Sequence, residues 1–141
     1  MDTINRQELE QFVELCDIKE NFNYDAEFMY NYVKDGKLVG VVAYMLQKDL
    51  GGNEYPRFIH VLIHPSIRKT KEAYKFVMNT FKDIKSKGYE VVVAVIPNWK
   101  QYMITLAEGF KFKEYHHDDE YKYYSMNIDD LIKRRKPNVY E

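Results

Sequence analysis

The sequence predicts a single α/β domain in which helices flank a mixed β-sheet. The chain has 141 residues, a length that suits one domain. Short apolar segments rich in β-branched residues, 38–46 and 91–96, indicate buried strands. An amphipathic segment of helical periodicity, 73–87, lies between strand 58–63 and strand 91–96. A strand–helix–strand order of this kind requires a parallel pair of strands.

The other elements follow from periodicity and turn residues. Apolar residues recur at helical spacing from Leu9 to Cys16, which predicts a helix over 8–18, and Asn5 followed by Glu8 has the pattern of a capping box. The remaining expected elements are a strand over 29–33, a turn at 35–37, a strand over 38–46, a loop over 48–56, a strand over 58–63, a helix over 73–87 before Gly88, a strand over 91–96, a helix over 99–108, a hairpin of 110–115 with 121–128, and a short helix that opens a basic tail over 129–141. Hairpins require antiparallel pairs, so the predicted sheet is mixed.

Charge and cysteine content exclude several classes of function. The formal net charge is −1, so the chain as a whole does not attract nucleic acid or an anionic membrane. Cys16 is the single cysteine, so neither an intrachain disulfide nor a four-cysteine zinc site can form. The N-terminus is polar, and no apolar stretch is long enough to span a bilayer. We therefore expect a cytoplasmic protein without a membrane or nucleic-acid partner.

Two motifs indicate a family. Residues 61–73, VLIHPSIRKTKEA, follow a strand and open a helix, and the Ile-Pro-Asn segment 96–98 precedes a helix that ends at the Gly-Phe pair 109–110. The first segment resembles the cofactor loop of the GNAT superfamily, in which Arg or Gln is followed by two residues, Gly, one residue, and then Gly or Ala. The second resembles the Asn, helix and Gly-Phe signature of the same family. The resemblance covers roughly residues 27–128 and implies a GNAT-like acyl-CoA N-acyltransferase fold with a splayed sheet.

The resemblance also implies a cosubstrate, acetyl-CoA or a similar acyl-CoA, bound by one GNAT-like domain over 1–128 that precedes the tail over 129–141. Arg68 takes the place of the family's Arg or Gln, Lys71 that of the first Gly, and Ala73 that of the second. Free N–H groups at a helix start favour anions such as a pyrophosphate. The residues implied to bind the cofactor are Leu62, Ile63, Arg68, Lys69, Thr70, Lys71, Glu72, Ala73 and Asn98.

The cofactor loop departs from the family at one glycine position. Lys71 stands there, and if the backbone has a positive φ at this point, lysine costs about 1 kcal/mol or more. The charges of Arg68, Lys69 and Lys71 would attract a pyrophosphate. A solvated basic helix start is the alternative interpretation.

Two residues are candidates for the chemical step, which needs an acid for the departing thiolate and a base for the amine. The family often has a tyrosine seven residues after the Asn, and Thr105 stands there in this sequence. Tyr102 is the candidate acid, with a packed aromatic residue as the alternative. His60 is the candidate base if a bulge shifts the strand register, with a hydrogen-bonded sheet histidine as the alternative.

The polar stretch 116–120, His-His-Asp-Asp-Glu, invites comparison with a metal site. Consecutive strand residues point to opposite faces, so we expect a solvated hairpin tip and no metal. Its acidity would favour a cationic amine if this hairpin shapes the acceptor site, as it commonly does in the family.

The function that these residues predict is transfer of an acetyl group from acetyl-CoA to an amine of a small molecule or protein. The alternative is a GNAT-like protein without activity, which would act as an interaction or structural module with a protein partner. The lysine at position 71 and the threonine at position 105 favour this alternative.

Overall fold

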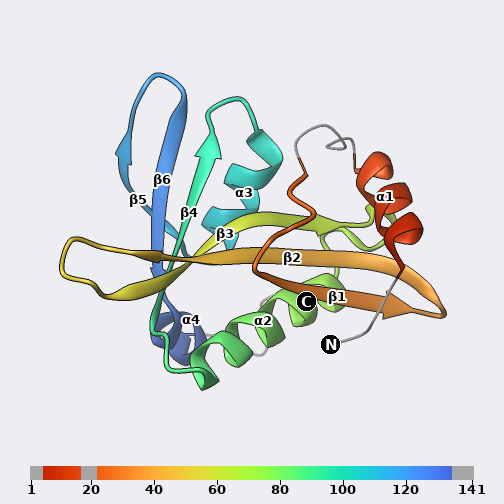
Figure 1. Cartoon of the computed structure of the whole chain (residues 1–141), viewed down its shortest axis with the longest axis horizontal. Coiled ribbons are helices and arrows are strands. Elements are labelled where there is room, and N and C mark those ends of the chain that lie inside the picture. Colours follow the sequence, from red (N-terminus) through yellow and green to blue (C-terminus); the bar gives the residue numbers. More distant parts are fainter. Residues whose placement is uncertain (1–4, 17–21, 135–141) are drawn as a thin grey trace. The chain divides into compact units, whose positions relative to one another are not determined.

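The computed structural model describes residues 5–16 and 22–134. Its helices and strands, labelled in Figure 1, are α1 (Arg6–Leu15), β1 (Phe28–Lys34), β2 (Lys37–Lys48), β3 (Glu54–Ile63), α2 (Lys71–Ser86), β4 (Val91–Pro97), α3 (Gln101–Gly109), β5 (Lys113–His117), β6 (Tyr121–Asn127) and α4 (Ile128–Arg134). A short 3-10 helix, η2 (Pro65–Ile67), lies between β3 and α2. The strands of this described part form one sheet in the order β1-β2-β3-β4-β6-β5. The predicted fold class, a mixed sheet with flanking helices, is confirmed.

The chain divides into two compact units. The first contains the described residues up to Met45 together with Ile59–Thr80, and the second contains Leu46–Phe58 together with the described residues from Phe81 onward. Strands β2 and β3 and helix α2 each contribute residues to both units. The two units are described separately below.

The first unit has a core between α1 and the strands. Leu9, Phe12 and Val13 form the buried face of α1, as the helical spacing predicts. The core cluster that contains them also includes Phe22, Leu38, Val41 and Leu62. The Asn5 side chain accepts a hydrogen bond from the Glu8 amide at 2.7 Å, so this half of the predicted capping box is confirmed.

The second unit buries one face of its strands against helices. Phe58 of β3 stacks on Phe81 of α2 with ring centroids 5.4 Å apart, and Phe112 packs beside both rings. On β6, Tyr124 is fully buried and lies opposite Ala94 of β4. The Tyr124 hydroxyl donates to Glu108 of α3 at 3.4 Å, so α3 covers the same face of the sheet.

Two strands begin three or more residues away from the start that the sequence predicts. Strand β3 begins at Glu54 rather than at residue 58, and the buried Pro56 lies inside it, so this proline does not mark a loop. The last hairpin begins at Lys113 rather than at residue 110. Lys111 has a φ of 67°, and the turn around it directs Phe110 and Phe112 into the core.

Strands β3 and β4 form the predicted parallel pair. Their register joins Arg57 to Val93 and Phe58 to Ala94. Both strands continue past these pairs, β3 to Ile63 and β4 to Pro97. None of the helices within residues 5–16 and 22–134 is both long enough and apolar enough to cross a bilayer.

Candidate functional site

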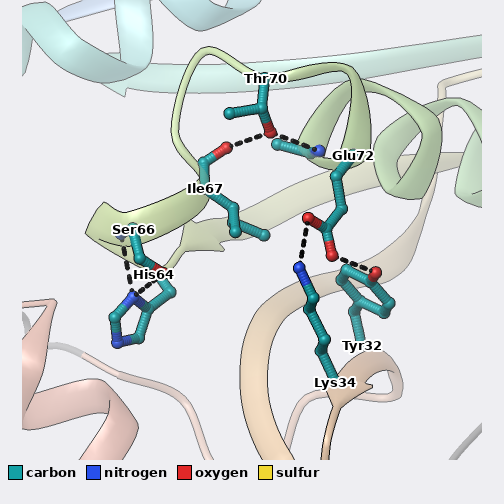
Figure 2. Close-up of polar contacts among 8 residues, drawn as sticks. Tyr32, Lys34, His64, Ser66, Ile67, Thr70 and Glu72 are labelled. Carbon is teal, nitrogen blue, oxygen red and sulfur yellow. Dashed lines mark hydrogen bonds and ion pairs between the residues drawn. The ribbon is translucent and has the colours of Figure 1, made fainter.

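The loop that follows β3 is held in place by its own residues. Ile67 is buried, and the His64 amide donates to the Val39 carbonyl at 2.8 Å. The His64 ring accepts a 3.0 Å hydrogen bond from the Ser66 amide through Nδ1 (Figure 2). These contacts fix the route of the chain from the end of β3 toward the start of α2.

Thr70 caps the N-terminus of α2. Its hydroxyl donates to the Ile67 carbonyl at 2.6 Å and accepts from the Ala73 amide at 3.2 Å (Figure 2). Its carbonyl accepts from the Tyr74 amide at 3.1 Å. This is the usual role of a threonine at a helix start, and it satisfies one of the amides that the first turn leaves without an intrahelical acceptor.

The amides just before and after this cap are free. Among the described residues, the N–H groups of Lys69, Thr70, Lys71 and Glu72 have no hydrogen-bond acceptor. They lie at the positive end of a helix of 16 residues. A cluster of unpaired donors at such a position can bind an anion, and a diphosphate matches it in charge and in number of acceptor oxygens.

The strained position of the loop is Lys69, which has a φ of 62°. Lys71 does not have a positive φ, so the strain considered for lysine at the family's glycine position does not arise there. Both side chains are exposed, and neither has an acidic partner among residues 5–16 and 22–134. They are the free cations of the loop.

The Arg68 side chain is directed back toward the unit's own backbone. Its Nε donates to the Ile63 carbonyl at 2.9 Å. It also contacts Cys16, where burial raises the pKa of the thiol and the charge and hydrogen bond of Arg68 partly offset this rise. Leu62 and Ile63 are both buried at the end of β3.

The Glu72 side chain points from α2 toward strand β1, as Figure 2 shows. Its carboxylate accepts from the Tyr32 hydroxyl at 2.5 Å and pairs with the Lys34 ammonium at 2.9 Å. These two contacts, first the tyrosine bond and then the lysine bond, lower the pKa of Glu72. Only the backbone of Glu72 is therefore placed to contact an anion at the loop.

His60, the candidate base, is buried in the first unit. Its Nε2 accepts a 3.1 Å hydrogen bond from the Asn23 amide, and its ring stacks on Phe22 at a centroid distance of 4.6 Å. A general base needs a free lone pair on the nitrogen that takes the proton. The lone pair of Nε2 already accepts the hydrogen bond from Asn23. This arrangement fits the alternative interpretation, a hydrogen-bonded sheet histidine.

Asn98 and Tyr102 belong to the second unit. Asn98 follows β4 and joins it to the β5–β6 turn, because its amide donates to the Glu120 carbonyl at 2.9 Å and its Nδ2 to the Asp118 carbonyl at 3.1 Å. Its Oδ1 is buried without a donor among the described residues. Tyr102 lies in the first turn of α3 with 39% of its surface exposed, so it is not a fully packed aromatic residue. Its role as the acid stays a prediction.

The acidic hairpin tip is built around Asp118. Its Oδ1 accepts from the amides of Glu120 and Tyr121 at 2.8 and 2.7 Å, and its Oδ2 accepts from the Tyr123 hydroxyl at 2.9 Å. The two backbone bonds, followed by the Tyr123 bond, lower the pKa of Asp118. This carboxylate stabilises the turn. No cluster of metal-ligating side chains occurs in the described part of the chain.

A cavity of about 630 Å³ lies beside this loop in the first unit. Its lining combines Phe12 of α1, Lys34 and Lys37 of the β1–β2 hairpin, and His64 and Ser66 of the loop. None of the described residues from 68 to 73 lines it. This cavity and the free amides of Lys69–Glu72 are thus separate features of the loop.

Comparison with known proteins identifies the fold. The sequence matches no protein-family model and no curated protein. The structure resembles solved acetyltransferases: Naa50 of Arabidopsis thaliana in complex with a bisubstrate analogue (TM-score 0.64, 13% identity, 89% of this chain and 96% of that one) and Ard1 of Thermoplasma volcanium (TM-score 0.69, 10% identity, 89% and 95%). It also resembles the PaiA N-acetyltransferase of Thermoplasma acidophilum in complex with coenzyme A (TM-score 0.61, 12% identity), where 71% of this chain covers only 60% of that protein. The chain therefore has the GNAT fold.

Proposed function

We propose that this protein is an N-acetyltransferase that uses acetyl-CoA and acts on an amine of a small molecule or protein. The GNAT fold supports the reaction class, and solved neighbours of this fold hold coenzyme A or a CoA-containing bisubstrate analogue. The observation with the greatest weight is the group of four free amides at Lys69–Glu72, flanked by the free cations of Lys69 and Lys71. A diphosphate gives these donors the acceptors that they lack.

The fit to acetyl-CoA rests on this chain's own polar groups. Thr70 keeps the first turn of α2 open to an anion, because it caps the Ala73 amide and leaves those of Lys71 and Glu72 free. By the resemblance, the backbone of Leu62 and Ile63 pairs with the amide-rich pantetheine arm. The resemblance also implies that Asn98 contacts the cofactor, and its Oδ1, a buried acceptor without a donor among the described residues, has the chemistry to receive an N–H group.

Acetyl-CoA, when bound, supplies a thioester whose acetyl carbon exchanges its bond to sulfur for a bond to the acceptor nitrogen. The proton lost by the amine ends on the sulfur, so free CoA leaves. The protein must orient the amine and accept its proton transiently before the proton reaches the sulfur. Because Nε2 of His60 is already hydrogen-bonded, we assign no base, and Tyr102 is the remaining candidate for delivery of the proton to sulfur.

Calorimetric titration with CoA and acetyl-CoA tests the proposal. The unmodified protein should bind both, and at one hundred times the dissociation constant the ligand should stabilise the fold by about 2.7 kcal/mol. Replacement of Lys69 and Lys71 together by Glu should weaken binding by roughly tenfold or more, since it places two negative charges beside the diphosphate. Lys82→Glu, an exposed position further along α2, is the matched control and should bind like the unmodified protein. Failure of the unmodified protein to bind at millimolar CoA would overturn the proposal.

A second candidate function is a GNAT-like interaction module without activity. Two observations favour it: the lone pair of His60 Nε2 is committed to the Asn23 amide, and Thr105 occupies the family's tyrosine position. Release of free thiol from acetyl-CoA over a panel of amines separates the two candidates. Binding of CoA without any thiol release would support a module that holds the cofactor, and turnover would exclude it.

A further inference from the structure

The second unit contains a cavity that the proposed cofactor contacts do not use. It has a volume of about 460 Å³, within the range of small-molecule sites. Its floor is formed by Val93 and Val95, on alternate positions of β4. The rest of the lining includes four tyrosines, at positions 55, 115, 121 and 123, and one cation, Arg57.

This cavity follows from the alternation of side chains along three neighbouring strands. Arg57 lies opposite Val93 in the β3–β4 register, and Val95 lies opposite Tyr123 in the β4–β6 register. Residues in register share a face of the sheet. The helices of this unit cover the other face, where Phe58 and Tyr124 are buried. Within the second unit, the Arg57 face is therefore left half-exposed.

Arg57 is a charge without a counter-charge. It has no ion pair and no hydrogen bond with any residue among 5–16 and 22–134, and none of the residues that line the cavity is acidic. A guanidinium is permanently charged and presents a planar fork that matches a carboxylate. A half-buried guanidinium among aromatic rings has lost part of its hydration. An anionic ligand beside it would replace the lost hydrogen bonds to water.

The tyrosines add an aromatic wall with free polar tips. Rings of Tyr115 and Tyr123 lie with centroids 6.3 Å apart, and Tyr121 is 38% exposed. The hydroxyl groups of Tyr55, Tyr115 and Tyr121 have no hydrogen-bond partner in the described part of the chain. Tyr123 is held differently, because its hydroxyl donates to Asp118 at 2.9 Å and fixes its ring beside the floor.

We propose that this cavity binds a small aromatic carboxylate, with the carboxylate on Arg57 and the aromatic ring among the tyrosines. A single lining cation matches a monoanion better than a phosphate dianion. Apolar valines with aromatic walls match a flat apolar body. If the proposed acetyltransferase function holds, this ligand is the acceptor of the acetyl group. It is then an amine that also carries an aromatic ring and a carboxylate, as an aromatic amino acid does. Only this identification rests on the proposed function.

The test compares matched probes on the full chain by calorimetry and ligand-observed NMR, without CoA. The unmodified protein should bind 3-phenylpropionate and should bind its neutral amide, 3-phenylpropionamide, roughly tenfold or more weakly, because a charge-assisted pair is lost. Inorganic phosphate should not compete. Equal binding of the acid and the amide, competition by phosphate, or binding of neither probe would each overturn the inference.

Variants locate the site. Arg57→Met should reduce affinity for 3-phenylpropionate to that of the amide, and Arg57→Lys should restore it in part because the charge returns without the fork. Arg6→Met is the control, since it removes the charge of an arginine that lies outside the cavity, with its guanidinium 3.8 Å from the centroid of the Tyr24 ring. Should Arg57→Met fail to fold, the comparison of acid and amide on the unmodified protein still decides the inference.

The outcomes also separate this inference from the proposed function. Binding of 3-phenylpropionate without CoA binding would support the aromatic-carboxylate site and reject the acetyltransferase. CoA binding without any binding of 3-phenylpropionate would support the acetyltransferase and reject the aromatic-carboxylate site. Acetylation of phenylalanine that falls in Arg57→Met through a higher KM would support both.

Discussion

The Tyr32 hydroxyl donates a 2.5 Å hydrogen bond to the Glu72 carboxylate, and this bond joins strand β1 to the first turn of helix α2. Because Glu72 stands next to the free amides of the loop, the same contact turns its negative charge away from them and toward Tyr32 and Lys34. The hydrogen bond to Glu72 is the main cause that raises the pKa of Tyr32 to about 12.

The raised pKa of Tyr32 predicts a loss of stability at alkaline pH. In the unfolded chain the phenol ionises near 10, so between pH 10 and pH 12 the unfolded state loses this proton before the folded state does. The contribution is therefore complete below pH 10 and is lost as the pH rises toward 12. We expect the difference in melting temperature between the unmodified protein and Tyr32→Phe to shrink over this window. A constant difference across the window would contradict the assignment.

The lowered pKa of Glu72 predicts the opposite dependence at acid pH. Its stabilising contribution is complete above the pKa of an ordinary glutamate and is lost as the pH falls through the lower pKa of the folded state. Melting temperatures of the unmodified protein and Glu72→Gln should differ at pH 6 and converge in strong acid. Glu10→Gln is the control for an exposed helix carboxylate, which pairs with Arg6 at 3.7 Å, and should show a smaller dependence.

Lys69 is the loop position at which glycine should stabilise the fold. Its φ of 62° lies in the left-handed region that costs an L-residue about 1 kcal/mol. We expect Lys69→Gly to raise the free energy of unfolding by about 0.5 kcal/mol, after the larger entropy of glycine in the unfolded chain is subtracted. Lys71→Gly, at the first position of α2, should instead lower it by up to about 1 kcal/mol. Urea unfolding of both variants measures the difference, and equal shifts would contradict it.

The fold was predictable because its signals are local. The spacing of Leu9 and Phe12 predicted the buried face of α1, and the apolar run from Val91 predicted the central strand β4. The chain order of these elements then restricted the sheet to a mixed topology. The misplaced boundaries at Glu54 and Lys113 arose where tertiary packing of Pro56 and Phe112 overrode the local turn signal.

The candidate site was less predictable because it depends on partners far away in the sequence. Nothing near Glu72 indicates that its side chain binds Tyr32, which precedes it by 40 residues. The same holds for His60, whose acceptor nitrogen is taken by Asn23. The aromatic cavity had one usable signal, the alternation of Tyr121 and Tyr123 on a strand, but only the register of three strands places Arg57 beside them.

The bond between His60 and Asn23 predicts a structural cost for removal of the imidazole. His60→Ala removes the acceptor of the part-buried Asn23 amide and the buried ring that stacks on Phe22, so we expect a loss of about 2–4 kcal/mol in the free energy of unfolding. His60→Gln offers an amide oxygen in place of Nε2 and should lose less. If His60→Gln keeps the stability but abolishes acetyl transfer, the histidine acts as the base despite its hydrogen bond. Urea unfolding and thiol release on the same samples decide this.

Asp118 predicts which part of the hairpin tip is structural. Its carboxylate accepts the Glu120 and Tyr121 amides and the Tyr123 hydroxyl, whereas Asp119 beside it has no such partner among the described residues. We expect Asp118→Ala to accelerate hydrogen exchange at these two amides and Asp119→Ala to leave it unchanged.

Because the pKa of Asp118 is lowered by these bonds, the protection that it provides should persist below the pKa of an ordinary aspartate and disappear only at stronger acid. Removal of the Asp118 carboxylate should also affect the cavity lined by Arg57 and the tyrosines, since Asp118 fixes the Tyr123 ring. Asp118→Ala should therefore weaken 3-phenylpropionate binding by a smaller factor than Arg57→Met, because it loosens one wall but leaves the cation in place. Equal protection of the Glu120 and Tyr121 amides in both alanine variants would show that the turn forms without this carboxylate.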